Sequence, residues 1–570
     1  MEKLLLFKKL LLLLLLSSIS SFCIAQVNQE WVVRHNGPGN NIDVTRSLAL
    51  DTAGNVYVTG SSTGSGTGLD YSTIKYDAAG VQQWEARYNG PGNNDDEPFS
   101  LAVDLKGNVY VTGRSVGNGT GFDYATIKYN AAGVIQWVAR YNSPNNGFDQ
   151  ANSIGVDGKG RVYITGESGL GANASSDYVT IRYNRNGKMQ WIARYDGPGR
   201  NDAANALALD KAGNVYVTGR SPIGLDLDEI DLDYTTIKYN KNGKQLWLNR
   251  YDGPVAGNLY DEALALTVDE SENAYVTGRS AGSNLEDAND YATVKYDANG
   301  NEQWASRYNG PGNSTDDALS LAVDTRHNVY VTGYSAVEPD QVNYDYATIR
   351  YDANGKEVWV SRYNGPADEN DQATSLALDG GGNVYVTGRS TGIGTGFDFA
   401  TIKYNAAGVE LWVTRYNGPA NGADGAGGTD VDRLGNVYVT GGSTGIGSGP
   451  DYTTIKYSQP LPAFVAREIS KPSGFTKELP AGFQMFNVPN PVSAITNIFY
   501  ELPFDGHVSL QVYDMMGRQI ATLVNGGKNA GYHNIYFDAS ALQKGIYNYR
   551  IILTTKTKVW VQTRKMCIIN

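Results

Sequence analysis

The sequence predicts an all-β protein in which an eight-bladed β-propeller is followed by a small Ig-like β-sandwich. Two observations predict the propeller. Eight tryptophans recur every 53 to 57 residues, and each opens nearly the same phrase. No segment of these repeats has the 3.6-residue apolar period of a helix. A fixed period of this length indicates repeated supersecondary units that bury their faces against one another. The tryptophans are Trp31, Trp84, Trp137, Trp191, Trp247, Trp304, Trp359 and Trp412.

Each repeat contains four short segments with the composition of strands. Runs of about 4 to 8 β-branched and aromatic residues, bounded by Gly, Asn, Asp and Pro, are typical of strands. Tight turns and longer connectors alternate between them, as expected for the four antiparallel strands of a propeller blade. In the first repeat the four strands are expected at 47–51, 55–59, 71–76 and 84–88.

The two ends of the repeat array predict that the ring closes. The array begins at 30–35 with a Trp-type fourth strand and ends at 451–457 with a third strand. The entering strand can therefore complete the eighth blade and remove an open sheet edge. An open solenoid is the alternative, but it needs polar caps that the sequence does not show.

Three phrases carry a resemblance to a known family: Gly-Asn-Val-Tyr-Val-Thr-Gly, Asp-Tyr-Ala-Thr-Ile-Lys-Tyr and Trp-x-x-Arg-Tyr-Asn-Gly-Pro. Over residues 29 to 457 the chain resembles the bacterial β-propeller repeat family that is named for seven-bladed propellers. The resemblance implies secretion and a scaffold role with no fixed chemistry. The sequence itself counts eight repeats and not seven.

Residues 1–25 have the pattern of a secretory signal peptide. Lys3, Lys8 and Lys9 precede a run of leucines, and small residues lead to Ala25. A membrane anchor is disfavoured because the apolar run is short, and a lipoprotein site at Cys23 is disfavoured by the bulky Phe22. We expect a propeller at 26–457, a Pro-rich linker at 458–482 and a C-terminal β-sandwich at 483–570, with no transmembrane span in a mature, monomeric protein.

Composition limits the partners and the cross-links. The net charge of −12 and the pI near 5.0 disfavour nucleic acid as a ligand. Cys23 and Cys567 are the two cysteines, so cleavage after Ala25 leaves one thiol and no intramolecular disulfide. Burial alone must then stabilise the exported chain.

The C-terminal segment contains six or seven short strand-like runs separated by Gly and Pro, which suggests a β-sandwich. It also resembles the type A C-terminal sorting domain that directs cargo to the type IX secretion system of Gram-negative bacteria. Val492-Ser493 departs from the usual Phe-Asn of that family. The resemblance implies the secretion machinery as a partner, passage across the outer membrane, and then removal of the domain or attachment to the cell surface. The residues that carry it include Asn490, Pro491, Tyr513, Asp514, Gly517, Arg518, Gly545, Tyr547 and Lys565.

No catalytic or metal-binding constellation stands out in the sequence. The four histidines lie at unlike positions, so no nucleophile–histidine pair or His/Cys metal spacing can be assembled. An Arg three residues after each Trp and an Asp before each third strand recur in every repeat. We interpret them as blade-to-blade ion pairs and turn caps rather than as a repeated ligand site.

Departures from the repeat are the better candidates for ligand binding. The connectors after the second and fourth strands are the long ones and share one face of a propeller. On that face three neighbouring blades carry acidic loops. These loops either reflect ordinary sequence variation in an acidic protein or bind Ca²⁺ or a basic partner. Asp430, in the last blade, either faces the channel or marks ring closure. The candidates are Asp226, Asp228, Glu229, Asp231, Glu286, Asp287, Glu338, Asp340 and Asp430.

Two functions from different classes follow. The first is a secreted or surface-displayed scaffold that binds a glycan or a protein, with no cofactor except possible Ca²⁺. The second is a secreted hydrolase or lyase with its site at the mouth of the channel, since propellers also host enzymes. The near-perfect repetition favours the non-enzymatic scaffold.

Overall fold

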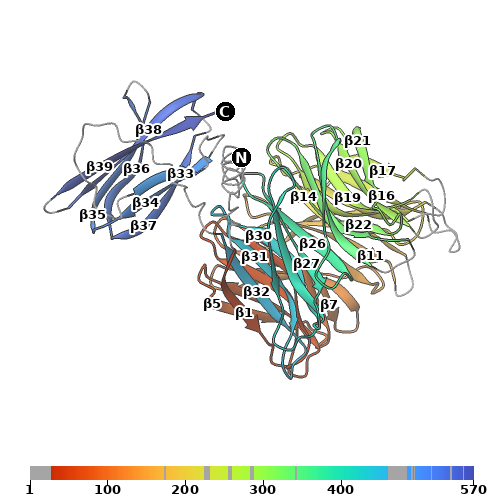
Figure 1. Cartoon of the computed structure of the whole chain (residues 1–570). Helices are drawn as coiled ribbons and strands as arrows, with labels where there is room; N and C mark the ends of the chain where they lie inside the picture. Colours follow the sequence, from red (N-terminus) through yellow and green to blue (C-terminus); the bar gives the residue numbers. More distant parts are fainter. Residues whose placement is uncertain are drawn as a thin grey trace, which may run out of the picture. The chain divides into compact units, whose positions relative to one another are not determined.

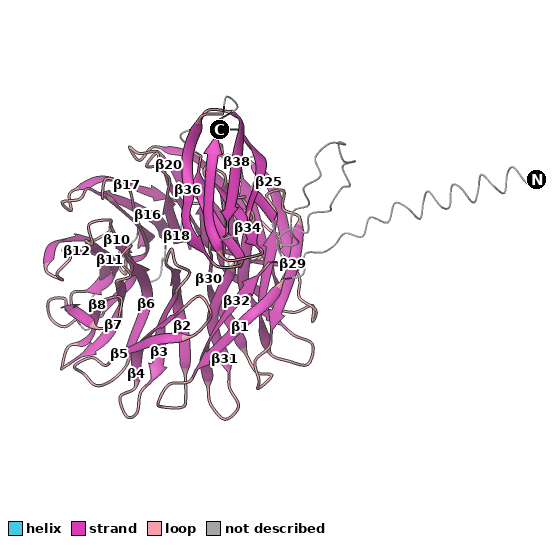
Figure 2. Ribbon diagram, turned by 90° about the vertical axis from the view of Figure 1, so that its left-hand side faces the viewer, coloured by secondary structure: helices cyan, strands magenta, loops and turns pink. Residues whose placement is uncertain are grey.

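The computed structural model describes residues 27–171, 175–223, 231–254, 260–282, 288–339, 343–459, 484–488, 492, 495–514, 517–539, 542–555 and 558–569. Every regular element in these ranges is a strand, as Figure 2 shows. The chain divides into two compact units, Met1–Ala463 and Phe464–Asn570. Among the described residues no helix is long and apolar enough to cross a membrane.

The first unit consists of eight four-stranded antiparallel sheets, the blades of the predicted propeller (Figure 1). Seven blades use four consecutive strands each. Blades 1 and 2 are β2 (Asp43–Leu50), β3 (Val56–Thr63), β4 (Leu69–Tyr76), β5 (Gln82–Tyr88), β6 (Asp96–Val103), β7 (Val109–Gly117), β8 (Gly121–Tyr129) and β9 (Ile135–Tyr141). Blades 3 and 4 are β10 (Asp149–Val156), β11 (Val162–Gly169), β12 (Ser176–Tyr183), β13 (Met189–Tyr195), β14 (Ala203–Leu209), β15 (Val215–Pro222), β16 (Leu232–Tyr239) and β17 (Gln245–Tyr251).

The remaining blades repeat the same order. Blades 5 and 6 are β18 (Glu262–Val268), β19 (Ala274–Ala281), β20 (Asn289–Tyr296), β21 (Glu302–Tyr308), β22 (Asp316–Val323), β23 (Val329–Ala336), β24 (Tyr344–Tyr351) and β25 (Glu357–Tyr363). Blade 7 is β26 (Asp371–Leu378), β27 (Val384–Thr391), β28 (Phe397–Tyr404) and β29 (Glu410–Tyr416). Blade 8 is β30 (Asp424–Val431), β31 (Val437–Thr444), β32 (Pro450–Ser458) and β1 (Asn28–His35).

The ring closes as the sequence predicts. β1 pairs antiparallel with β32, with Val32 opposite Ile455 and Arg34 opposite Thr453. The first strand of every blade contacts the first strands of both neighbouring blades, including β30 with β2. The eight-bladed, closed arrangement is therefore confirmed, and the seven blades of the family name do not apply to this chain.

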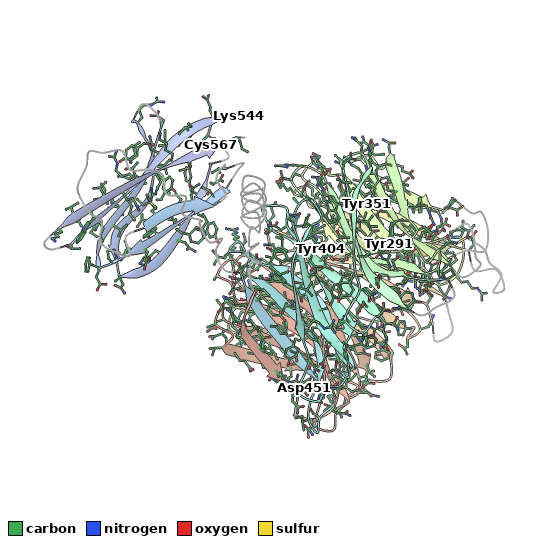
Figure 3. The ribbon with its side chains drawn as sticks, in the orientation of Figure 1. Tyr291, Tyr351, Tyr404, Asp451, Lys544 and Cys567 are labelled. Atoms are coloured by element: carbon green, nitrogen blue, oxygen red, sulfur yellow. The ribbon has the colours of Figure 1, made fainter. Side chains whose placement is uncertain are left out.

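The core of the propeller lies between blades rather than within one. Tyr57 and Tyr71 of blade 1 pack against Leu101, Val109 and Val111 of blade 2, and equivalent clusters recur around the ring. Inside each blade the threonine of the second strand forms a hydrogen bond with a threonine of the third, as between Thr112 and Thr126 at 2.9 Å. Figure 3 labels three more core tyrosines, Tyr291, Tyr351 and Tyr404, each at most 1% exposed.

In seven of the eight blades the recurrent tryptophan joins the blade to the tight turn of the next, whereas Trp412 Nε1 has no hydrogen-bond partner among the described residues. Trp84 Nε1 donates a hydrogen bond to the carbonyl oxygen of Ala131 at 3.0 Å. Its ring covers Gly133, where a Cβ would lie 2.6 Å from Trp84 Cδ2. The tryptophans are partly buried, except that Trp412 is 4% exposed. The glycine of this turn is thus required both by its φ of +78° and by the ring above it.

The second unit contains two antiparallel sheets, as expected for a small sandwich. Their apolar faces share one core that includes Ile498, Val508, Leu510, Tyr549 and Ile551. The three-stranded sheet has the order β33 (Gln484–Val488), β34 (Ile495–Leu502), β37 (Gly531–Asp538). The four-stranded sheet has the order β36 (Gln519–Lys528), β35 (Gly506–Tyr513), β38 (Gly545–Thr554), β39 (Val559–Ile568).

Candidate functional site

The long connectors of the propeller form one face, which we call the connector face. They contact one another: Gly39 N donates to the carbonyl oxygen of Thr63 at 3.0 Å, and Asn40 Nδ2 donates to that of Gly447 at 3.2 Å. Leu69 N likewise donates to Asp95 Oδ1 at 3.0 Å. The connector after a second strand therefore lies beside the connector that follows a fourth strand, as the sequence predicts.

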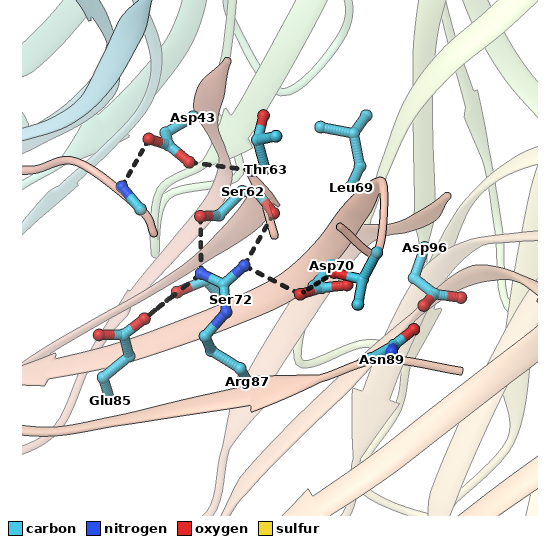
Figure 4. A network of polar contacts seen from close by, with 12 residues as sticks. Asp43, Ser62, Thr63, Leu69, Asp70, Ser72, Glu85, Arg87, Asn89 and Asp96 are labelled. Carbon is cyan, nitrogen blue, oxygen red and sulfur yellow. Dashed lines mark hydrogen bonds and ion pairs between the residues drawn. The ribbon is translucent and has the colours of Figure 1, made fainter. Parts of the chain in front are cut away.

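A repeated arginine network supports this face from below (Figure 4). Arg87 Nη1 donates to Ser62 Oγ at 2.7 Å, and Nη2 forms an ion pair with Asp70 at 3.0 Å. The same Arg–Asp pair recurs in all eight blades, at 2.7 to 3.2 Å.

The prediction that these ion pairs join neighbouring blades is wrong. Each pair joins the third and fourth strands of a single blade, which form a hairpin in blades 1 to 7 and are β32 and β1 in blade 8. The link between blades is instead a hydrogen bond from the arginine to a tyrosine of the preceding blade, such as Arg140 Nη1 to Tyr88 Oη at 3.0 Å. At the seam between blades 8 and 1, His35 stands in place of that tyrosine and contacts Glu85 at 3.3 Å.

A second recurrent aspartate fixes each connector. Asp96 Oδ2 accepts a hydrogen bond from Gly90 N at 2.6 Å, and Asp316 accepts one from Gly310 N at 2.7 Å. Burial raises the pKa of Asp96 and of Asp316 to about 6, against the hydrogen bonds that favour the charged form. These carboxylates are structural, because they repeat with the same partners.

One set of side chains that differ from blade to blade lies at the connector end of the first two strands, where the first strands of neighbouring blades contact one another around the ring. They occupy two paired positions: the first or second residue of the first strand, at its connector end, and the residue opposite it on the second strand. We call them the rim pairs: Val44–Ser61, Glu97–Arg114, Gln150–Glu167, Ala203–Arg220, Glu262–Arg279, Asp317–Tyr334, Gln372–Arg389 and Gly425–Gly442.

Two parts of the rim are built differently. Around blade 2, Arg114 forms an ion pair with Glu97 and lies against three rings, with its guanidinium 4.5 Å from the centroid of Phe122, 5.7 Å from Phe99 and 5.9 Å from Phe148. Phe148 is 39% exposed. This arrangement presents an aromatic and cationic surface to solvent.

Around blades 4 to 6 the rim is a network of buried charges. Glu262, 3% exposed, accepts from Arg220 at 2.8 Å and from Arg279 at 2.5 Å. Burial opposes ionisation of Glu262, but the two guanidinium groups outweigh it and lower its pKa. Burial raises the pKa of the nearby Glu167. The network can therefore hold one carboxylate charged and another more readily protonated.

The rim was missed by the sequence reasoning, although a signal was present. The phrase Val-Thr-Gly-Arg-Ser places arginine after the glycine of the second strand in some blades, and Ser, Glu, Tyr or Gly in the others. In blades 8 and 1 the rim pairs Gly425–Gly442 and Val44–Ser61 carry no charge. Arg389 forms hydrogen bonds with the amide oxygen of Gln372 but has no carboxylate partner among the described residues.

Most of the predicted acidic residues lie outside the described part of the chain. Those residues are Asp226, Asp228, Glu229, Glu286, Asp287 and Asp340. Asp231 lies beside Asp233 and Asp252, with one oxygen of each within 4.8 Å of the others. Glu338 is exposed and belongs to no carboxylate cluster of the described residues.

Asp430 lies at the seam where the ring closes. It accepts a hydrogen bond from the backbone N of Val431 at 2.8 Å and one from Leu50, on the first strand of blade 1. Burial raises its pKa to about 6, despite these two bonds. Its contacts thus join blade 8 to blade 1.

The opposite face of the propeller, formed by the tight turns, has a cavity of about 300 Å³ between blades 1 and 2. Tyr57, Lys75 and Asp104 line it. These residues belong to the repeated phrases, so this cavity offers no chemistry particular to one blade.

In the second unit the structure places several of the predicted motif residues. Asp514 Oδ1 accepts from the backbone N of Arg518 at 2.9 Å, and Asp514 Oδ2 forms an ion pair with Arg518 at 2.7 Å. Gly517 lies in the same turn with a φ of +81°. Gly545 begins β38, Tyr547 Oη donates to the carbonyl oxygen of Gln543 at 3.1 Å, and Lys565 lies on β39. Asn490 and Pro491 lie outside the described residues.

Comparison with known families assigns both units. The family described as "Beta-propeller repeat" matches residues 30–66, 83–120 and 190–224. The family described as "Secretion system C-terminal sorting domain" matches residues 488–568. An uncharacterised WD repeat-containing protein of Acanthamoeba polyphaga mimivirus is 23% identical over 414 residues, which cover 51% of this chain and 29% of that protein. The chain thus spans less than a third of the length of this relative.

Similar solved structures include PorZ, an essential bacterial surface component of the type-IX secretion system of Porphyromonas gingivalis. It is 12% identical with a TM-score of 0.30, over 92% of this chain and 74% of that one. The β-propeller domain of the Trilobed protease from Pyrococcus furiosus is 9% identical with a TM-score of 0.37, over 64% of this chain and 94% of that one. TM-scores this low support no inference about function.

The sorting domain indicates export to the cell surface or into the medium. Sequence repeats, closed blades and family matches agree on the first unit, and the turn chemistry and family match agree on the second. The chain contains β-propeller repeats and a C-terminal sorting domain of the type IX secretion system.

Proposed function

We propose that the protein is an exported binding scaffold that holds a glycan or protein ligand on the connector face. The observation that carries this proposal is the rim: its side chains vary from blade to blade while the supporting Arg–Asp network repeats. A repeated frame with variable side chains on one face suits recognition, because loops and rims on a rigid scaffold can change without loss of the fold.

The surface around Arg114 is the first candidate for contact with the ligand. Aromatic rings give a flat apolar surface, and a guanidinium donates several hydrogen bonds in one plane. Phe122 and Phe148 lie edge to face with their centroids 6.0 Å apart. This combination is suited to sugar rings or to the polar edge of a peptide. The stack of arginine on phenylalanine recurs in blade 7, where Arg389 lies 4.7 Å from the centroid of Phe397, but Ala423 there takes the place of Phe148.

A binding screen on the purified full chain tests the proposal. The wild type is applied to a glycan array and used to capture surface proteins from the producing organism. Phe148→Ala should weaken the binding of any captured ligand at least tenfold. Leu105→Ala, on the tight-turn face and 92% exposed, is the matched control and should bind as the wild type does. Equal loss in both variants, or no loss in either, would refute a ligand at the rim.

A second candidate function is hydrolysis at the channel mouth, and one observation favours it. Glu167 has a raised pKa and Glu262 a lowered one, and such divergent pairs can act as acid and base. Polysaccharide substrates should then be cleaved by the wild type and not by Glu167→Gln. Turnover that is unchanged in this variant would exclude Glu167 as the acid.

We further propose that the C-terminal unit is recognised by the type IX machinery and is then removed or used for surface attachment. Deleting residues 483–570 in a host with this machinery should retain the propeller in the periplasm. Normal delivery of the truncated chain to the surface or medium would contradict the proposal.

A further inference from the structure

Every first strand of the propeller shifts register against its second strand, as at a β-bulge, and the extra residue differs from blade to blade. It is Arg46 in blade 1, Phe99 in blade 2, Gly427 in blade 8, and asparagine, leucine or threonine in the other five. In blades 3, 4 and 7 its side chain donates to a carbonyl oxygen of the next first strand, as Asn152 Nδ2 does to Ala204 at 2.9 Å. A bulge re-aims a side chain, and here it directs one residue of each blade towards its neighbour.

Arg46 is the one charged residue at this position. Its side chain is exposed, and its guanidinium lies 5.9 Å from the centroid of the Phe99 ring in blade 2. Within the described ranges Arg46 forms neither an ion pair nor a hydrogen bond through its side chain. A guanidinium placed over a ring keeps its N–H donors in one plane, so those of Arg46 are available to a ligand.

Arg389 of blade 7 is a second arginine of this kind. Its guanidinium lies 4.7 Å from the centroid of Phe397. Arg389 is exposed, whereas the residues at the equivalent position in the other seven blades are partly or fully buried. The arginines at that position in blades 2, 4 and 5 each pair with a glutamate. Arg389 therefore shares with Arg46 an exposed guanidinium that lies against a ring and has no carboxylate partner among the described residues.

Blade 8 lies between the two arginines and leaves them accessible. A Cβ at Gly425 would have one heavy atom within 4 Å, Arg389 Cβ at 3.8 Å. A Cβ at Gly427 would likewise meet one atom, the carbonyl oxygen of Thr45 at 3.5 Å, and Thr45 precedes Arg46. The first strand of blade 8 therefore adjoins both arginine-bearing strands without a side chain at either position.

The charge of this section is opposite to that of the whole chain. The net charge of the chain is −12, so most of its surface repels an anion. From blade 7 through blade 8 to blade 1, the rim pairs and the bulge residues contain two positive charges, Arg389 and Arg46, and no negative one. A guanidinium binds a carboxylate through two parallel hydrogen bonds, so this section is suited to a carboxylate ligand.

We propose that the section from blade 7 to blade 1 binds an acidic polysaccharide, with sugar carboxylates on Arg46 and Arg389. This inference rests on the proposed binding function of the connector face and names the class of its ligand. A polymer with a carboxylate on every unit can reach two separate guanidinium groups in any register. An acidic peptide is less suited, because peptide binding depends on large buried anchors, and Val44 and Ser61 of this section are small.

Calorimetric titration of the purified full chain with polygalacturonate tests the proposal. The methyl ester of the same polymer has its carboxylates masked and should bind at least tenfold more weakly. Arg46→Gln and Arg389→Gln should each weaken the binding of polygalacturonate at least tenfold. Arg433→Gln, in the exposed tight turn of blade 8, is the matched control and should bind as the wild type does. The melting temperature of each variant checks that it folds.

A variant that adds a charge tests the same section without removing a contact. Gly442→Glu gives blade 8 the residue that blade 3 has at the equivalent position, Glu167. A Cβ at Gly442 would make ordinary contacts with Val44 at 3.4 Å and Pro450 at 3.6 Å, so the variant should fold normally. Its carboxylate should weaken the binding of polygalacturonate at least tenfold by repulsion.

The proposal is overturned if polygalacturonate does not bind, if its methyl ester binds equally well, or if Arg433→Gln loses as much affinity as Arg46→Gln. Equal affinity for poly-L-glutamate would overturn the assignment to a polysaccharide. The proposed scaffold function is judged separately, by the glycan array, the capture experiment and Phe148→Ala.

Discussion

The contact between each tryptophan and the glycine of the next blade allows a quantitative test in blade 2. Gly133 has a φ of +78°, and a Cβ there would lie 2.6 Å from Trp84 Cδ2. Gly133→Ala should therefore destabilise the protein for two separate reasons. A left-handed conformation costs an ordinary residue about 1–2 kcal/mol, and forcing an extra methyl group into a packed contact costs about 1–3 kcal/mol more.

Gly119→Ala is the matched control. Gly119 has a φ of +80° in the same blade, but a Cβ there would meet nothing within 4 Å. Its loss should be limited to the conformational cost, about 1–2 kcal/mol.

A double-mutant cycle separates the two causes, with the free energy of unfolding measured from urea melts of each variant. In the background Trp84→Ala the ring is absent, so Gly133→Ala should cost no more than Gly119→Ala does. Equal costs for the two alanine substitutions in the wild-type background would refute the reasoning. A cost for Gly133→Ala that persists in full without the ring would refute it as well.

Three other perturbations follow from the same structure. Trp191→Ala should destabilise the propeller without abolishing ligand capture. Because Trp191 is only partly buried, the loss should be smaller than the roughly 3–5 kcal/mol that truncation of a fully buried aromatic side chain costs. An unchanged melting temperature would contradict this. Acidification from pH 7 to pH 5 should raise the melting temperature through Asp430. Its pKa in the folded chain, about 6, lies above the ordinary aspartate value of 3.8, so its stabilisation is complete below pH 3.8 and is lost as the pH rises through 6. Asp430→Asn should weaken this dependence, and an identical pH profile in both proteins would argue against it. Removing residues 27–35 should leave β32 as an open edge and promote self-association, which light scattering measures; a monodisperse monomer of unchanged stability would contradict the role of β1.

The fold could be predicted because every repeat contains the same pattern of strands and turns, so each one is independent evidence for a blade. Strand segments, turn glycines and the unmatched ends at Trp31 and Tyr457 all gave the same blade count, so an error in one repeat could not shift the others. The partner of Arg87 could not be assigned from residue type alone, since any of eight aspartates matched. The separation of 17 residues within a hairpin, shared by Arg87–Asp70 and six other pairs, was the signal that would have placed it.

The site was less predictable than the fold. In the sequence, the variation at rim residues such as Arg114 and Glu262 cannot be told from random variation between repeats. The strand register shows that these residues occupy equivalent positions in their blades. Asp252 has a carboxylate where six counterparts have an amide, and its neighbours Asp231 and Asp233 come from the preceding connector and from β16. Long-range proximity of this kind is set by packing, and no local pattern contains it.

The pairing of β1 with β32 also constrains the order in which the propeller can form. Val32 and Ile455 are partners separated by about 420 residues, so the last blade must wait for both ends of the array. The equilibrium cost of this closure grows only with the logarithm of the chain length. Its rate, however, depends on an encounter between the most distant segments of the propeller. A chain that has crossed a membrane unfolded would thus carry seven assembled blades and one exposed sheet edge until its two ends meet.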